Sequence, residues 1–149
     1  VSVSGYVQQE DIFFGSLTVG EHLNLHAHLR LPSEMSAKER KERVTKVAED
    51  MLLSSTLKTR IGEPGEGEKG ISGGEAKRLA FATALLSEPA ILFCDEPTTG
   101  LDSYTAKLVI QQLVRLTTTY NKTIVCTIHQ PASEIFELFD RVLLLAVGR

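Results

Sequence analysis

Apolar residues recur every three or four positions in a charged stretch near the end of the first third of the chain. They are Val44, Val47, Ala48, Met51 and Leu52. This spacing places them on one face of a helix, and Ser36 and Glu39 have the spacing of a capping box at its start. The pattern predicts a helix over about residues 37–53.

The stretch before this helix carries two competing signals. Four apolar residues alternate with polar ones, which is the periodicity of a strand. They are Leu23, Leu25, Ala27 and Leu29. Thr18 and Glu21, in contrast, have capping-box spacing, and on that signal we expect a helix. Glycine, proline and glutamate crowd residues 62–70, which indicates a loop.

The second half of the chain contains three short continuous apolar runs, at residues 90–94, 123–128 and 142–146. Runs of this length suit strands that are buried on both faces of a parallel sheet. A helical stripe separates the first two. It consists of Ala106, Val109, Ile110, Leu113 and Val114. Strand, helix and strand in this order predict βαβ units and an α/β fold with a mainly parallel sheet.

Composition narrows the class of protein. The 149 residues include 16 Lys and Arg against 19 Asp and Glu, a net charge of −3. This balance gives no support for a nucleic-acid partner. The longest apolar run, Val142–Val147, is far shorter than the roughly 18 residues of a transmembrane helix. Cys94 and Cys126 each lie inside an apolar run, and we expect buried, reduced thiols.

Two adjacent carboxylates, Asp95 and Glu96, follow the first apolar run. Ligands of open α/β sheets bind beyond the carboxyl ends of the strands, and paired carboxylates there need a cationic partner. Asp95 is placed to hold Mg²⁺, which keeps several of its waters. Glu96 could orient or deprotonate an attacking water. A solvated acidic turn is the alternative interpretation.

Ser72 and Glu75 have capping-box spacing for a helix that runs to about Leu86. Gly73 and Gly74 remove side chains from its first turn. Backbone N–H groups at the positive end of a helix dipole are a site for a phosphate. A flexible loop that leads into a capped helix would show the same pattern.

Histidine and glutamine residues offer weaker signals. His129 follows the second apolar run and could donate to a phosphate oxygen, although a structural histidine is the alternative. Gln9 could touch Mg²⁺ or an attacking water. Three further histidines lie close together, and we expect a polar helix face there in preference to a metal site. They are His22, His26 and His28.

The ordered combination of these motifs, together with Gly100-Leu101-Asp102, resembles the nucleotide-binding domain of ATP-binding-cassette (ABC) proteins. The resemblance implies a partial P-loop NTPase-like α/β domain with an inserted helical subdomain. It also implies a role for each motif residue. Gln9 is the Q-loop glutamine, Ser72, Gly73, Gly74 and Glu75 are the signature motif, Asp95 is the Walker B aspartate, Glu96 is the catalytic glutamate, Asp102 belongs to the D-loop, and His129 is the switch histidine.

Three segments narrow the resemblance to the G, or White, subfamily. They are Gly70–Ala82, Thr127–Phe136 and Phe136–Asp140. Two positions depart from the pattern, because Thr99 stands where serine is common and Val147 replaces a usually polar residue. Members are half-transporters that pair through two nucleotide-binding domains. They use ATP and Mg²⁺ to move lipids, sterols, pigment precursors or xenobiotics.

The resemblance also implies how the chain is organised. It is a partial nucleotide-binding domain, with residues of about 18–70 as the helical subdomain with its loop, and 1–17 and 71–149 as parts of the core. The domain would lie on the cytoplasmic side of a membrane, joined to a transmembrane domain of the same chain. Which membrane and which substrate are involved stays open.

A phosphate-binding loop of the form G-x-x-x-x-G-K-[ST] does not occur in this sequence. The nearest stretch, Gly62–Gly70, carries glutamates that would repel a triphosphate, and its proline lacks a donor amide. We expect the true loop, and the adenine-stacking aromatic, upstream of Val1. The chain alone is then expected to bind ATP poorly and to hydrolyse almost none.

Two other functions remain as alternatives. The first is a soluble ABC ATPase of translation or DNA maintenance. The 63 positions from Gln9 to Ser72 leave no room for the long coiled coil of the DNA-maintenance type. The second is a truncated, non-enzymatic module that pairs with other nucleotide-binding domains.

Overall fold

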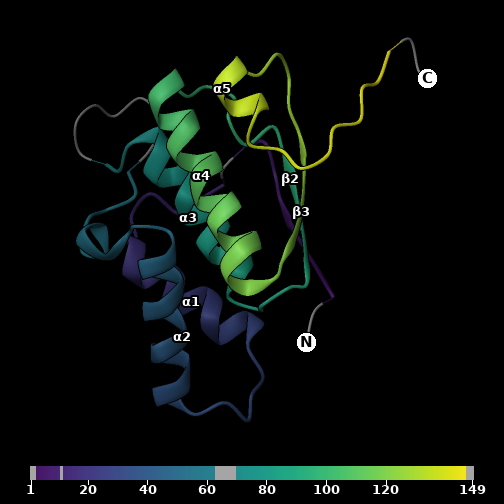
Figure 1. The fold of residues 1–149 in the computed structure, drawn as a ribbon. Helices are drawn as coiled ribbons and strands as arrows, with labels where there is room; N and C mark the ends of the chain where they lie inside the picture. Colours follow the sequence, from purple (N-terminus) through teal and green to yellow (C-terminus); the bar gives the residue numbers. More distant parts are fainter. Residues whose placement is uncertain (1–2, 11, 63–69, 147–149) are drawn as a thin grey trace.

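The computed structural model describes residues 3–10, 12–62 and 70–146. Its centre is a three-stranded parallel sheet of β1 (Ser4–Val7), β2 (Ile91–Asp95) and β3 (Thr123–Thr127), in the order β1-β2-β3 (Figure 1). The structure therefore confirms the strands predicted from the apolar runs at 90–94 and 123–128, and with them the parallel α/β fold. The sequence did not predict β1, because four residues with one buried side chain leave no apolar run.

The strand residues alternate between a covered and an uncovered face of the sheet. Leu92 and Cys94 are buried, and α3 (Gly73–Leu85) and α4 (Ser103–Tyr120) lie on one side of the strands (Figure 1). The opposite face carries a row of three paired residues that are 59%, 41% and 48% exposed. They are Tyr6, Phe93 and Val125. Cys94 and Cys126 are both free cysteines, as predicted, but only Cys94 is buried, whereas Cys126 is partly exposed.

Helices α1 (Val19–Arg30) and α2 (Ala37–Asp50) form a separate layer, below α3 in Figure 1. Both begin at the predicted capping boxes, on Thr18 and on Ser36. The strand-like alternation of apolar residues in α1 does not correspond to a strand, and two of its four leucine and alanine positions, Leu25 and Leu29, are solvent-exposed. Its buried residues instead follow helical spacing. They are Val19, His22, Leu23 and Ala27.

Helix α2 ends three residues before the predicted boundary. The N–H of Leu53 donates to the Ala48 carbonyl at 2.8 Å, and the N–H of Leu52 donates to the Glu49 carbonyl at 3.0 Å. Leu52 has φ +55°. These two bonds form a Schellman motif, which closes the helix before the last two apolar residues of the stripe. A 3₁₀ turn, η1 (Ser54–Thr56), follows.

The third predicted strand, over residues 142–146, is wrong. This segment is irregular and highly exposed, with Leu143 at 84% and Leu145 at 80%. It follows the short helix α5 (Ser133–Phe136) and leads away from the sheet (Figure 1). An apolar run forms a strand only where a neighbouring edge supplies hydrogen bonds, and within the described residues no strand pairs with it.

Parts of two predictions lie outside the described residues. They are residues 63–69 of the predicted loop and Val147. Within the described ranges, none of the helices combines the length and apolar character needed to cross a membrane.

Candidate functional site

The carboxyl ends of the three strands place the predicted polar residues at one edge of the sheet. β1 leads to Gln9, β2 ends in Asp95 followed by Glu96, and β3 leads to His129. The structure brings the side chains of Gln9 and Glu96 into contact. Gln9 Nε2 donates a hydrogen bond to Glu96 Oε2 at 2.9 Å. Residues 87 positions apart in the sequence thus meet because parallel strands end at the same edge.

Asp95 is held on both of its carboxylate oxygens. The Thr127 hydroxyl donates to Oδ1 at 2.6 Å, and the Tyr6 hydroxyl donates to Oδ2 at 3.2 Å. The hydrogen bond to this carboxylate raises the pKa of the Tyr6 phenol above its usual value. Sequence reasoning did not identify Tyr6 or Thr127. Their roles follow from sheet register, which pairs Thr127 with Asp95 across β2 and β3.

Glu96 has an unusual backbone conformation and a fixed side chain. Its φ is +42°, a left-handed value that costs a non-glycine residue about 1–2 kcal/mol. Its N–H donates to Thr127 Oγ1 at 3.0 Å, and its Oε2 also accepts from the Thr99 hydroxyl at 2.7 Å. Such strain persists where surrounding contacts enforce it, and it clusters at functional sites.

His129 is not joined to the other candidate residues. It is exposed and follows β3 by two positions. The next residue, Gln130, has φ +45°, so the backbone turns sharply here. Among the described residues, the structure shows no hydrogen bond between His129 and Asp95 or Glu96.

Ser72 caps α3, as predicted. Its hydroxyl accepts from the Glu75 N–H at 3.3 Å and donates to Glu75 Oε2 at 2.8 Å, and the same carboxylate oxygen accepts from the Ser72 N–H at 2.8 Å. The two glycines differ in their surroundings. Gly73 is exposed, whereas Gly74 is buried against Thr105 of α4. Packing alone therefore accounts for the absence of a side chain at the second glycine.

Asp102 caps the neighbouring helix, α4. Its Oδ1 accepts from the N–H groups of Tyr104 and Thr105 at 3.1 and 3.0 Å, and its Oδ2 accepts from the Thr105 hydroxyl at 2.6 Å. The hydrogen bonds from Thr105 hold the pKa of this carboxyl below its usual value. The first turns of α3 and α4 thus meet, because Thr105 contacts both Asp102 and the Gly74 position.

The donor set at the strand ends fits Mg²⁺. Two carboxylates, one amide and hydroxyl groups gather there, and all of them offer oxygen. No group of three or more His, Cys, Asp or Glu residues that could hold a metal occurs in the described part of the chain. Mg²⁺ is commonly bound through one or two carboxylates together with substrate phosphates, not by a full protein cage. Asp95 and Gln9 suit such a partial site.

The prediction of a polar helix face for the three N-terminal histidines is wrong for His22. Its side chain is buried, and Nε2 lies 3.1 Å from the Thr83 hydroxyl oxygen. The centre of its ring lies 4.3 Å from that of the tilted His26 ring, and it meets the Phe13 ring edge-on at 5.1 Å. Burial lowers the pKa of His22 to about 4.

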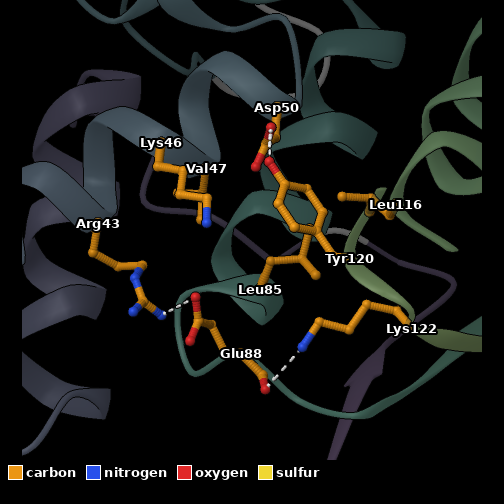
Figure 2. Close-up of a pocket in the computed structure, with 9 residues that line it drawn as sticks. All are labelled: Arg43, Lys46, Val47, Asp50, Leu85, Glu88, Leu116, Tyr120 and Lys122. Atoms are coloured by element: carbon orange, nitrogen blue, oxygen red, sulfur yellow. Dashed lines mark hydrogen bonds and ion pairs between the residues drawn. The ribbon is translucent and has the colours of Figure 1, made fainter. Parts of the chain in front are cut away.

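A small hollow of about 40 Å³ lies at the other end of the sheet and contains none of the candidate residues. It opens between α2 and the C-terminal part of α4, where Tyr120 donates to Asp50 at 2.7 Å and Arg43 pairs with Glu88 at 3.0 Å (Figure 2). Lys122, the residue directly before β3, also lines it. The hollow is therefore separate from the strand-end site.

Known proteins resemble this chain in sequence and in fold. A sequence model of the family described as "ABC transporter" matches residues 2–99. The protein named white of Ceratitis capitata is 53% identical over 144 residues, covering 97% of this chain and 21% of that protein. The protein named scarlet of Drosophila melanogaster is 54% identical over 147 residues, covering 99% of this chain and 22% of that protein. The "Broad substrate specificity ATP-binding cassette transporter ABCG2" of Bos taurus is 47% identical over 146 residues, covering 98% of this chain and 22% of that protein.

These relatives confirm the resemblance to the White subfamily, and the chain spans about a fifth of their length. A solved structure of the ATP-binding cassette MJ0796, dimeric and bound to ADP and Pi, is 27% identical with a TM-score of 0.75. The match covers 99% of this chain and 60% of the MJ0796 chain. Because the family match spans well over half of its residues, the chain belongs to the ABC transporter family.

Proposed function

We propose that this chain is part of the nucleotide-binding domain of an ATP-driven, White-type half-transporter. ATP binding and hydrolysis at a dimer of such domains powers the movement of a lipid, sterol, pigment precursor or xenobiotic across a membrane. The similarity to white, scarlet and an ATP-binding cassette transporter supports this function over a soluble ABC ATPase. The observation that carries it is the direct hydrogen bond from Gln9 to Glu96 beside Asp95.

Glu96 is the proposed general base. Its carboxylate is held by Gln9 and Thr99, and its N–H by Thr127. Held in this way, the carboxylate can accept a proton from a water molecule as the water oxygen bonds to the terminal phosphorus of ATP and ADP leaves. Gln9 lies within hydrogen-bond distance of the same carboxylate oxygen, so its amide can orient that water.

Asp95 and Gln9 would hold Mg²⁺, which neutralises phosphate charge when bound. The two hydroxyl donors on Asp95 fix the direction of its carboxylate before any ligand arrives. His129 is exposed at the same edge of the sheet. It would donate a hydrogen bond to a phosphate oxygen.

The capped N-terminus of α3 would serve a nucleotide bound on a second nucleotide-binding domain. Ser72, Gly73, Gly74 and Glu75 form that turn, and Asp102 caps the adjoining helix. The dimeric form of the cassette MJ0796 supports such a partner. A helix N-terminus attracts phosphate oxygens through its free N–H groups.

The remaining assignments concern the larger protein. Residues of about 18–70, with α1 and α2, form the proposed helical subdomain, and residues 1–17 and 71–149 belong to the catalytic core. The helical subdomain would pass motion to a transmembrane domain of the same chain. The nucleotide-binding domain would then lie on the cytoplasmic side of the membrane.

The test is Glu96→Gln in the full-length protein. This change removes the proton acceptor but keeps the size and polarity of the side chain. We expect kcat for ATP hydrolysis to fall about 10²- to 10⁴-fold, while ATP still promotes dimers. Glu137→Gln is the matched control, because Glu137 is exposed and follows α5. Hydrolysis at the normal rate in Glu96→Gln would remove Glu96 from this role.

A further inference from the structure

Lys77 is a buried charged residue on the helix that begins with the Ser72 cap. Only 4% of its surface is exposed. Its Nζ donates a hydrogen bond to the backbone carbonyl oxygen of Gln9 at 2.6 Å. Burial of an ammonium group costs several kcal/mol unless it is well bonded. A methionine or leucine would fill the same space between α3 and the sheet without this cost, so the charge has a purpose beyond packing.

The hydrogen bond from Lys77 reaches a backbone segment that does not take part in sheet pairing. β1 pairs with β2 only from Ser4 to Val7, and Gln9 lies two residues beyond the last pair. A hydrogen bond with a charged donor is about twice as strong as one between neutral groups. Lys77 therefore fixes the main chain at the point from which the Gln9 side chain reaches Glu96.

We propose that Lys77 is a positioning residue, which acts through the Gln9 backbone to hold the Gln9 amide against Glu96. This inference rests on the proposed ATPase function. It gives α3 two separate tasks. The N-terminal turn, from Ser72 to Glu75, serves the nucleotide on the partner domain, whereas Lys77, two residues further along, serves the site of its own chain.

Dimers with a single working site separate these two tasks. One subunit of the full-length protein carries Lys77→Met, and the two subunits are purified through different tags. Glu96→Gln in the other subunit leaves hydrolysis only at the site that uses Gln9 of the Lys77→Met subunit. Glu96→Gln in the Lys77→Met subunit itself leaves only the site to which that subunit contributes Ser72 to Glu75.

We expect kcat to fall about 10- to 100-fold at the first site, the usual range for loss of a group that supports an active-site ligand. At the second site we expect a change of less than about twofold, and KM for ATP should change little at either. Gln9→Ala should remove most of the effect, so that Lys77→Met adds no further loss in that background. Lys107→Met, at a surface ion pair with Glu134, is the control and should leave both sites unchanged.

Equal losses at both sites would overturn the proposal, because a structural role of Lys77 in α3 affects both. So would a loss confined to the second site, or no loss at all. Lys77→Gln, which keeps a polar head without charge, is read by the same criteria if Lys77→Met does not assemble. The dimer with Glu96→Gln in both subunits and Lys77 intact tests the proposed function separately. If it hydrolyses ATP normally, the role of Glu96 fails whatever Lys77 does.

Discussion

Gly74 and Thr105 are in such close contact that a Cβ atom on Gly74 would lie 2.3 Å from Thr105 Cγ2. This contact brings the first turn of α3 against the first turn of α4. Gly74→Ala should therefore destabilise the chain by about 1–3 kcal/mol, the usual cost of overpacking. The loss should appear although alanine is the better helix former by about 1 kcal/mol. Urea unfolding followed by circular dichroism measures it.

Two further variants show whether the contact itself is responsible. At Gly73 a Cβ atom would meet Leu101 Cδ2 at an ordinary 3.5 Å, so Gly73→Ala should be neutral or stabilising. Thr105→Ser removes Cγ2 and keeps the hydroxyl that bonds Asp102, so it should restore most of the stability lost in Gly74→Ala. Equal effects of alanine at both glycines would contradict this explanation.

The Thr127 hydroxyl connects both acidic residues of the candidate site, since it donates to Asp95 and accepts from the Glu96 N–H. Thr127→Val keeps the shape of the side chain but removes both bonds. We expect kcat for ATP hydrolysis in the full-length protein to fall about 10- to 100-fold, and Thr127→Ser to retain most of it. Thr123→Val, at the exposed start of the same strand, is the control. A normal rate in Thr127→Val would show that these bonds do not matter for turnover.

Local signals in the sequence predicted the helices well. The capping boxes at Thr18, Ser36 and Ser72 fix three helix starts through contacts only three residues apart, and all three are present in the structure. Such signals depend on neighbouring residues alone, so they can be recognised without knowledge of the tertiary fold. The apolar runs at 90–94 and 123–128 also predicted β2 and β3 correctly, and these two strands pair with each other in the sheet.

Features that depend on distant residues could not be predicted in this way. The links from Tyr6 and Thr127 to Asp95 require the register of three strands. The run at 142–146 has the composition of a strand, yet whether it pairs depends on a neighbouring edge. His22 looked polar from its sequence neighbours, but its side chain faces Thr83 of another helix. The roles proposed for Asp95, Glu96 and His129 rest on their positions after apolar runs together with the family resemblance.

Leu52 occupies the position after the α2 cap at which glycine is favoured. Its φ is +55°, a backbone conformation that is unfavourable for a residue with a Cβ atom. Its side chain is 50% exposed, so burial offsets little of this cost. Leu52→Gly should stabilise the chain by about 1 kcal/mol, because glycine adopts this conformation without strain. The urea midpoint should rise. Leu29→Gly, at an exposed position inside α1, should lower it by about the same amount. A lower midpoint for Leu52→Gly would mean that its side chain packs favourably.

His22 should make the stability of the chain depend on pH between about 4 and 6.5. Burial, and then the charges of His26 and Arg30, lower its pKa in the folded state from 6.5 to about 4. In this window the unfolded chain binds more protons than the folded chain, so the free energy of unfolding rises with pH. The contribution is complete above pH 6.5 and is lost as pH falls towards 4. A shift of this size corresponds to about 3 kcal/mol.

His22→Phe isolates this effect from the titration of the carboxylates. Phenylalanine keeps a ring beside Phe13, and the Thr83 hydroxyl still donates to the Leu79 carbonyl at 2.8 Å. The difference in unfolding free energy between the parent chain and His22→Phe should therefore shift by up to about 3 kcal/mol in favour of the variant from pH 7 to pH 4.5. A pH-independent difference for His22→Phe would mean that the folded chain accepts a proton on His22 as easily as the unfolded one does.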